Sequence, residues 1–268
     1  MWAMGDTSSS FDKNAQSLQS WWEDAQLAFV FLTRIPWKIT HEIPDQALNR
    51  AVRTFPLIGL MIGGAGATLF SIAHLAHLPD LVCALLAIMV CVLITGALHE
   101  DGLADVADGF GGGFDKDKKL EIMRDSRTGA YGVLALIFSI GLRVFCLAGF
   151  DNWQMGAASL VAVSALSRLG PVILLYNMDP ARTDGLAAKM EKPDQVIVGQ
   201  SVFVALAIFM LAAPFESGWL ALIFSALALF GFKKLAQSQV GGHTGDVCGS
   251  AQQIIEVTAL LVLVAASS

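Results

Sequence analysis

Apolar residues fall in seven long runs that short polar segments separate. The runs cover residues 55–78, 81–98, 131–150, 155–176, 196–215, 219–235 and 251–266. A helix needs about 20 residues to cross the roughly 30 Å of hydrocarbon in a bilayer, so the last two runs are short and their ends are the least defined. In lipid, each segment must satisfy its own backbone polar groups unless a barrel closes. The pattern therefore predicts an all-α fold, a polytopic membrane helix bundle of about seven transmembrane helices.

The overall composition supports a membrane location. Hydrophobic residues make up 55% of the 268 residues and charged residues only 15%, and the mean hydropathy is +0.61. A soluble domain of this length carries far more charge. The chain therefore belongs in a bilayer.

The N-terminal region differs from the rest. Residues 1–20 are polar and lack the basic and apolar sections of a secretory leader, so we expect a disordered tail there. Residues 21–37 are apolar but are interrupted by charges and a proline, which predicts an interfacial helix anchored by Trp21, Trp22 and Trp37. A membrane-spanning version of this helix is the alternative. In either case, we expect residues 21–268 to form a single integral membrane catalytic domain.

Positive charge predicts the orientation in the membrane. Every Lys and Arg except Arg143 and Arg168 lies before the first run, between runs two and three, between runs four and five, or at the end of run six, where Lys233 and Lys234 stand. The alternate connections carry none. Basic loops remain on the cytoplasmic side, so this side is expected to hold the N-terminus and the polar loops.

Three aspartates follow the second run, in the sequence His-Glu-Asp-Gly-Leu-Ala-Asp-Val-Ala-Asp-Gly at residues 99–109. Asp101, Asp105 and Asp108 are four and three residues apart, so in a helix they share one stripe and can converge on one ion. Carboxylates suit Mg²⁺ or Mn²⁺, the usual partners of phosphate substrates. The motif predicts metal-assisted phosphoryl chemistry at a membrane surface. A solvated acidic helix start is the alternative.

Two further cytoplasmic loops carry candidate substrate groups. Arg124 and Arg127 could grip phosphate oxygens, although anchoring to anionic lipid would also explain them. The glycine-rich loop at residues 241–249 could bring backbone N–H groups to an anion, and its Asp246 could add a metal ligand. Helix capping by Thr244 or Asp246 is the alternative for that loop.

Two arginines lie inside apolar runs, where a charge usually faces the bundle interior or water. Arg168 is about two turns from the cytoplasmic end of its helix, so we expect it to reach the substrate. Arg143 lies farther from that side and is expected to pair internally.

Several of these motifs occur together, in order, in one known family. The chain resembles the cobalamin synthase family, adenosylcobinamide-GDP ribazoletransferase, from about Thr33 to the C-terminus. The residues that carry the resemblance are 55–59 (Phe-Pro-Leu-Ile-Gly), the acidic motif at 99–109, 122–127 (Ile-Met-Arg-Asp-Ser-Arg), Ser167-Arg168 and 241–246 (Gly-Gly-His-Thr-Gly-Asp). One position departs from it, because His243 stands where the resemblance leads us to expect Gln.

The resemblance implies a multi-pass enzyme of the bacterial inner membrane with its active site facing the cytoplasm. It implies Mg²⁺ as cofactor and a reaction that joins adenosylcobinamide-GDP to α-ribazole or its 5′-phosphate with release of GMP, a late step of cobalamin biosynthesis. The expected partners are these substrates and membrane lipid. Nucleic acid is not expected, and a homo-oligomer is left open.

With the residue patterns, the resemblance assigns roles as hypotheses. Asp101, Asp105, Asp108 and Asp246 are the candidate metal ligands, and His99 or one of the aspartates is the candidate general base. The candidate substrate and phosphate contacts are Arg124, Asp125, Ser126, Arg127, Arg168, His243 and Thr244.

Two other classes of protein remain as alternatives. A lipid enzyme resembling the CDP-alcohol phosphotransferases would share the Asp-x-x-Asp-Gly pattern at residues 105–109, but the Ala-Arg expected after it is absent. An ion-coupled transporter would also explain intramembrane arginines, although its polar groups should lie toward the midplane.

Overall fold

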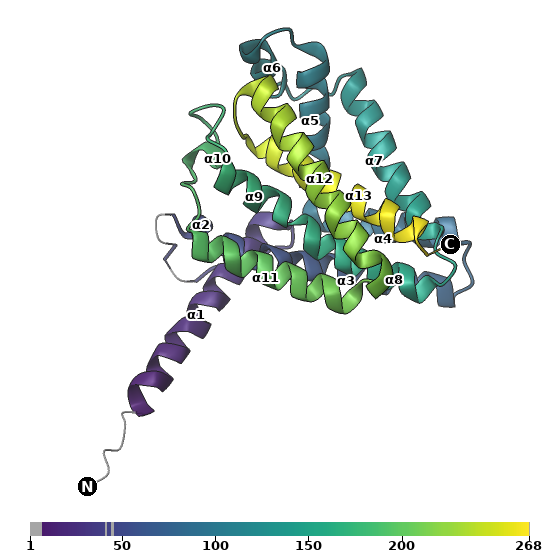
Figure 1. Ribbon diagram of the computed structural model, residues 1–268, viewed down its shortest axis with the longest axis horizontal. Coiled ribbons are helices and arrows are strands. Elements are labelled where there is room, and N and C mark those ends of the chain that lie inside the picture. The colour runs from purple at the N-terminus through teal and green to yellow at the C-terminus, as the bar shows by residue number, and fades with distance from the viewer. Residues whose placement is uncertain (1–6, 41, 44–45, 268) are drawn as a thin grey trace.

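The computed structural model describes residues 7–40, 42–43 and 46–267, and within these ranges the chain is helical apart from turns and one isolated bridge between Pro180 and His243. Figure 1 shows the arrangement of the helices. Their bounds are α1 Thr7–Leu32, α2 Ala47–Ala51, η1 Val52–Thr54, α3 Phe55–Leu75, α4 Asp80–Thr95, α5 Leu98–Gly112, α6 Lys116–Ile122, α7 Ala130–Ala148, α8 Trp153–Ser167, α9 Leu169–Asn177, α10 Leu186–Lys189, α11 Gln195–Ala212, α12 Phe215–Val240 and α13 Gly245–Ala265.

Each of the seven predicted runs is helical. In the part of the chain that is described, six helices are long and apolar enough to cross a membrane, with α2, η1 and α3 counted together and α8 and α9 counted together. A seventh span results if α4 and α5 are one broken segment. The predicted all-α polytopic bundle is confirmed.

The second predicted run ends earlier than expected. Helix α4 stops at Thr95, and Gly96 and Ala97 follow in the left-handed region with φ of 65° and 58°. Two successive left-handed residues cannot continue a right-handed helix. The chain therefore turns by 89°, and the polar helix α5 begins at Leu98.

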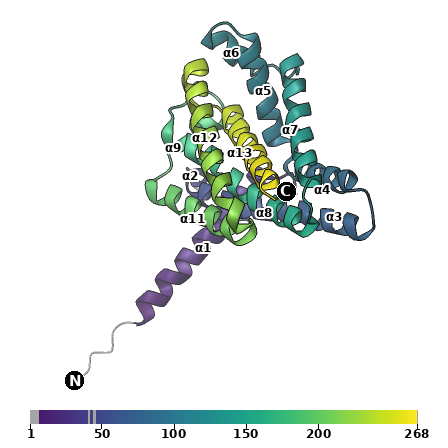
Figure 2. The same ribbon diagram turned by 45° about the vertical axis from the view of Figure 1, so that its right-hand side comes forward.

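The last helix begins earlier than its predicted apolar run. Helix α13 starts at Gly245, six residues before the expected 251, because Thr244 caps it by accepting a hydrogen bond from the Val247 N–H at 3.2 Å. Asp246 therefore lies in the first turn of a helix. Figure 2 shows α13 between α12 on one side and α5 with α7 on the other.

Helix α1 corrects part of the expectation for the N-terminus. It begins at Thr7, inside the segment for which a disordered tail was expected, and ends at Leu32 instead of reaching Trp37. Good helix formers such as Ala, Gln and Lys within residues 12–19 account for the helix. Residues 1–6 of the expected tail lie outside the described residues.

Buried charge attaches this helix to the bundle, although its first half projects away from the other helices in both views. Asp24 is 1% exposed and accepts hydrogen bonds from Arg53 at 2.7 Å and Arg50 at 2.8 Å. Helix α1 is not among the helices apolar enough to span. The alternative that residues 21–37 span the membrane therefore gains no support. The position of this segment at the membrane interface stays a prediction.

Close packing of α3 against α8 forms one side of the bundle. A Cβ atom at Gly59 would lie 2.3 Å from the Ser164 carbonyl oxygen. Only glycine permits this approach of two helix backbones. The packing positions α8 and α9 beside α13, where the polar residues of the chain gather.

Candidate functional site

Helix α5 presents the three aspartates of the acidic motif. Because residues 98–112 are helical, Asp101, Asp105 and Asp108 lie along one stripe, as their spacing predicts. Their surroundings differ: Asp101 is exposed, Asp105 is half-buried and Asp108 is buried. The shared stripe is therefore confirmed, but the three carboxylates do not share one environment.

Asp246 joins this stripe because α13 packs directly on α5. A Cβ atom at Gly102 would lie 2.9 Å from the Asp246 carbonyl oxygen, and the Ser250 hydroxyl donates to the Gly102 carbonyl at 3.0 Å. Burial, and then the charges of Asp101, Asp246 and Asp108, raise the pKa of Asp105 to about 7. Negative charge is thus concentrated where the two helices meet.

The nearest basic partner of this cluster is Arg182, in the loop before α10. Its guanidinium lies 3.6 Å from the Asp246 carboxylate. The sequence patterns did not single out Arg182, although it is one of three basic residues in the loop between runs four and five. Carboxylate oxygens are the ligands that a divalent metal such as Mg²⁺ prefers. Within the described ranges, however, no three His, Cys, Asp or Glu side chains converge closely enough to hold an ion.

Asp108 has partners of its own, apart from the other carboxylates. It accepts hydrogen bonds from the Gly129 N–H at 2.7 Å and the Gly132 N–H at 2.9 Å. These donors belong to the first turn of α7, where a negative charge is also favoured by the helix dipole. Asp108 thus fixes the start of α7 against α5, and its role as a metal ligand stays a prediction.

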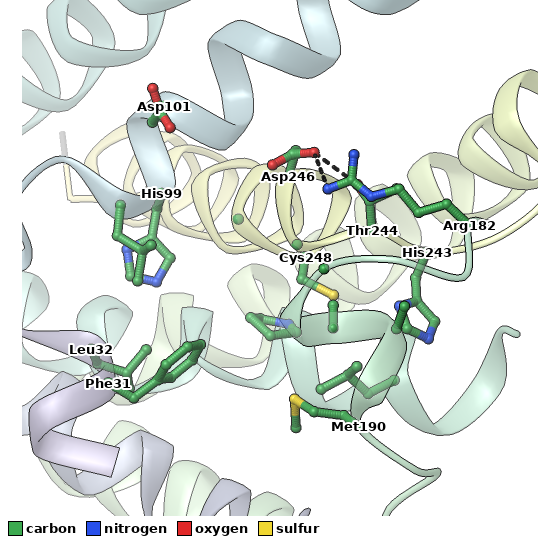
Figure 3. A pocket seen from close by; sticks show the side chains of 18 of the residues that line it. Phe31, Leu32, His99, Asp101, Arg182, Met190, His243, Thr244, Asp246 and Cys248 are labelled. Atoms are coloured by element: carbon green, nitrogen blue, oxygen red, sulfur yellow. Dashed lines mark hydrogen bonds and ion pairs between the residues drawn. The ribbon is translucent and has the colours of Figure 1, made fainter. Parts of the chain in front are cut away.

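A cavity of about 270 Å³ lies beside the acidic cluster (Figure 3). Its polar wall includes His99, Asp101, Arg182, His243 and Asp246. The structure therefore brings together residues from α5, from the loop before α10 and from the start of α13. Sequence distance hides this convergence, because these segments are about 80 and 60 residues apart.

His243 projects into this cavity from a rigid loop. Its backbone N–H donates to the Asp179 carbonyl at 2.9 Å, and its carbonyl accepts from the Ala181 N–H at 2.8 Å. The ring is 3% exposed, and its Nδ1 has no hydrogen-bond partner in the part of the chain that is described. Burial lowers the pKa of His243, opposed by the charge of Asp179. At neutral pH this ring is therefore uncharged, with one nitrogen free for a ligand.

Thr244 lies next to this ring and has a structural partner. Its hydroxyl accepts from the Val247 N–H as the cap of α13 and donates to the Asp246 carboxylate at 3.1 Å. The capping alternative accounts for these contacts. Its predicted contact with phosphate stays a prediction.

The Asp-Ser-Arg loop lies outside the cavity. The Arg127 side chain is 87% exposed and pairs with Asp125 at 2.6 Å, and this hydrogen bond lowers the pKa of Asp125 to about 2. Ser126 is exposed. Arg124 pairs at 2.5 Å with Asp184, which does line the cavity. The loop therefore contacts the cavity edge through Arg124, whereas Asp125, Ser126 and Arg127 do not line the cavity.

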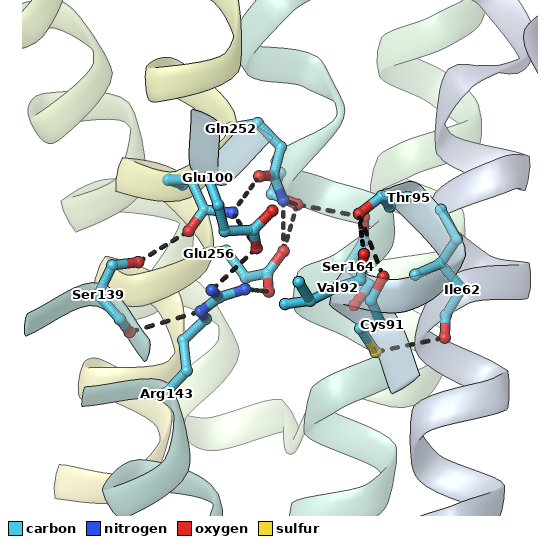
Figure 4. Close-up of polar contacts among 12 residues, drawn as sticks. Ile62, Cys91, Val92, Thr95, Glu100, Ser139, Arg143, Ser164, Gln252 and Glu256 are labelled. Atoms are coloured by element: carbon cyan, nitrogen blue, oxygen red, sulfur yellow. Dashed lines mark hydrogen bonds and ion pairs between the residues drawn. The ribbon is translucent and has the colours of Figure 1, made fainter. Parts of the chain in front are cut away.

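The two intramembrane arginines belong to one buried network beneath the site. Figure 4 shows the part of it around Arg143, Glu100 and Glu256. Arg143 lies 2.9 Å from Glu100 and 3.2 Å from Glu256, and Arg168 lies 3.3 Å from Glu256. All four side chains are at most 6% exposed. The predicted internal pairing of Arg143 is confirmed.

Arg168 lies in the internal network and not at the 270 Å³ cavity. It is 2% exposed and does not line that cavity. Its predicted contact with the substrate stays a prediction. Glu256, its partner, was not identified from the sequence. A signal existed, because an acidic residue inside an apolar run needs a basic partner at the same depth.

A bundle of apolar helices whose carboxylates and arginine meet at a cavity is typical of a membrane protein that binds a charged ligand. A family model described as cobalamin-5-phosphate synthase matches residues 24–264. The chain belongs to this family, and it is therefore a transferase of cobalamin biosynthesis built on membrane helices.

Curated relatives named adenosylcobinamide-GDP ribazoletransferase agree with this family. The Rhizobium meliloti (strain 1021) protein is 42% identical over 254 residues, which are 89% of this chain and 95% of the relative. The Azorhizobium caulinodans protein is 45% identical over 81% of this chain and 84% of the relative. The Brucella anthropi protein is 41% identical over 88% of this chain and 94% of the relative. No solved structure matches the chain significantly. The match favours the ribazoletransferase prediction over the lipid phosphotransferase and the transporter.

Proposed function

We propose that the cavity between α5 and α13 is the place where this transferase joins adenosylcobinamide-GDP to α-ribazole or its 5′-phosphate. The observation that carries the proposal is the convergence of Asp101, Asp246 and Arg182 on one cavity. A diphosphate substrate needs positive charge beside its oxygens. The acidic cluster can supply that charge only by binding a cation. Arg182 supplies one such charge directly.

The reaction is a displacement at phosphorus. A ribose hydroxyl of α-ribazole attacks the phosphorus attached to cobinamide, the bond from that phosphorus to the bridging oxygen breaks, and GMP leaves with that oxygen. The hydroxyl proton passes to a base on the protein. His99 and Asp101 are the residues of α5 that line the cavity and can accept it. Arg182 orients the phosphate oxygens.

The metal expected for this chemistry is Mg²⁺. We propose Asp101, Asp105 and Asp246 as the carboxylates that would hold it, because their charges lie together on two packed helices. Their side chains would have to move closer together to bind it. When bound, Mg²⁺ supplies the positive charge that offsets the diphosphate and the departing GMP. Asp108 would act on the site by holding α7 in place.

The activity can be tested with the purified protein. Incubation with Mg²⁺, adenosylcobinamide-GDP and α-ribazole should release GMP, and removal of the metal with a chelator should stop it. Omission of α-ribazole is the control. GMP released without α-ribazole would indicate a hydrolase, and no GMP under any condition would reject the proposed function.

The site is proposed to face the cytoplasm of a bacterial inner membrane. Basic residues lie on the side of the acidic cluster, and the relatives named above are bacterial. In a background without the native cysteines, Asp151→Cys should react with an impermeant thiol reagent on intact spheroplasts. Phe114→Cys, at a side chain that is 99% exposed, should react only after permeabilisation. The reverse pattern would place the cavity on the outer side.

His243→Gln tests the role of the one residue that departs from the family pattern. If the ring only donates or accepts a hydrogen bond, Gln offers both functions at similar reach, and turnover should fall by less than about tenfold. Loss of a general base would instead remove about 10²- to 10⁴-fold of the rate. Burial lowers the pKa of His243 and so weakens the ring as a base, which supports the hydrogen-bonding role. GMP release at equal protein level distinguishes the two, and a loss beyond a hundredfold would make His243 the leading base.

A further inference from the structure

The cavity has two walls of opposite character. Figure 3 shows Phe31, Leu32 and Met190 on one side, and Asp101, Asp246 and Arg182 on the other. The apolar wall comes from the end of α1, the start of α3, helix α9 and Met190 just after α10, all of them remote in sequence from the acidic motif. Diphosphate chemistry alone gives no reason for such a wall. Its presence indicates that part of the substrate is apolar and buried.

Resting on the proposed function, we propose that this apolar wall binds the benzimidazole base of α-ribazole. Phe31 and Phe55 are stacked, with ring centroids 5.8 Å apart and planes inclined by 23°. Phe31 is half-buried, whereas Phe55 is 2% exposed. A flat aromatic base placed on Phe31 would extend this stack and bury its own apolar surface.

The size of the cavity selects between the two substrates. About 270 Å³ lies at the lower end of small-molecule sites. This volume accommodates a bicyclic base with its ribose, and it is too small for a corrin macrocycle. The cobinamide part must therefore remain outside and present its diphosphate at the exposed Asp101.

Two buried polar atoms at the cavity have no hydrogen-bond partner among the described residues. These atoms are His243 Nδ1 and Arg182 Nη1. A buried polar atom without a partner is unfavourable, and a bound ligand that pairs with it recovers that cost. A riboside lying along the cavity would offer hydroxyl groups near this polar wall while its base stays on the apolar wall. This orientation directs a ribose hydroxyl toward the acidic cluster.

The test compares the Michaelis constants of the two substrates. Phe31→Leu keeps an apolar side chain but removes the aromatic face, which is worth about 0.5–1.5 kcal/mol in a stacked pair. We expect the KM for α-ribazole to rise about three- to tenfold, with the KM for adenosylcobinamide-GDP and the kcat within about twofold of wild type. Phe70→Leu is the matched control, because Phe70 is 1% exposed in a core cluster away from the cavity.

A binding measurement separates this proposal from the proposed function. Equilibrium dialysis of α-ribazole alone against the detergent-solubilised wild type should detect binding, and Phe31→Leu should weaken it by the same factor. An increase in the KM for adenosylcobinamide-GDP instead, or equal effects of Phe31→Leu and Phe70→Leu, would overturn the subsite. If the wild type binds α-ribazole but releases no GMP, the subsite stands and the proposed function fails.

Discussion

Asp101→Asn and Asp105→Asn are each expected to abolish Mg²⁺-dependent GMP release, with losses of about 10²- to 10³-fold or more. Asn keeps the shape of the side chain but removes the charge that a hard cation needs. Loss of one preorganised electrostatic group at a reacting centre commonly has an effect of this size. Folding should be retained, since Asp101 is exposed and each change relieves repulsion among neighbouring carboxylates.

Asp108→Asn is the informative comparison, because its partners are structural. An amide has one acceptor oxygen, so either the Gly129 or the Gly132 N–H group loses its acceptor. The loss costs about 1–3 kcal/mol if it falls on Gly132, which is buried. This variant should therefore lower the Tm by several degrees, whereas the other two should not. GMP release over a Mg²⁺ titration and thermal unfolding in detergent together measure both effects. Near-normal turnover in all three variants would reject the carboxylate site.

The helices of this fold follow from local sequence. An apolar run of about 20 residues has few stable structures in lipid other than a helix, so the seven runs became helices almost where the pattern placed them. The stripe of Asp101, Asp105 and Asp108 needs only the 3.6-residue period. Arg143 could be assigned to an internal pair because an unpaired charge at that depth is costly.

What the sequence did not predict depends on contacts between distant segments. The 89° turn after α4 rests on left-handed Gly96 and Ala97, and alanine gives no signal for that conformation. Arg182 reaches the site only because its loop folds back to Asp246. The apolar wall comes from Phe31 and Phe55, whose sequence context reads as ordinary membrane-facing or core residues. None of these features has a local pattern.

Glu256→Gln is expected to destabilise the protein by about 3–5 kcal/mol, the cost of breaking a buried ion pair from one side. Glu256 pairs with both Arg143 and Arg168, so its neutralisation leaves two buried guanidiniums with Glu100 as their acidic partner in the network. The low dielectric of the bundle screens the excess positive charge poorly. Thermal unfolding in detergent micelles, at fixed lipid content, measures the loss.

The double variant Arg168→Met with Glu256→Gln tests charge balance in the network. It removes one charge of each sign and leaves the Arg143–Glu100 pair, 2.9 Å apart, intact. We expect it to be more stable than either single variant, which leaves the network with one uncompensated charge. Purely additive losses would show that the four side chains are energetically independent. His99 lines the same small polar space as Glu100, Arg143 and Arg168. The single variants should therefore also reduce turnover, because they loosen the start of α5. The double variant should recover part of the lost turnover.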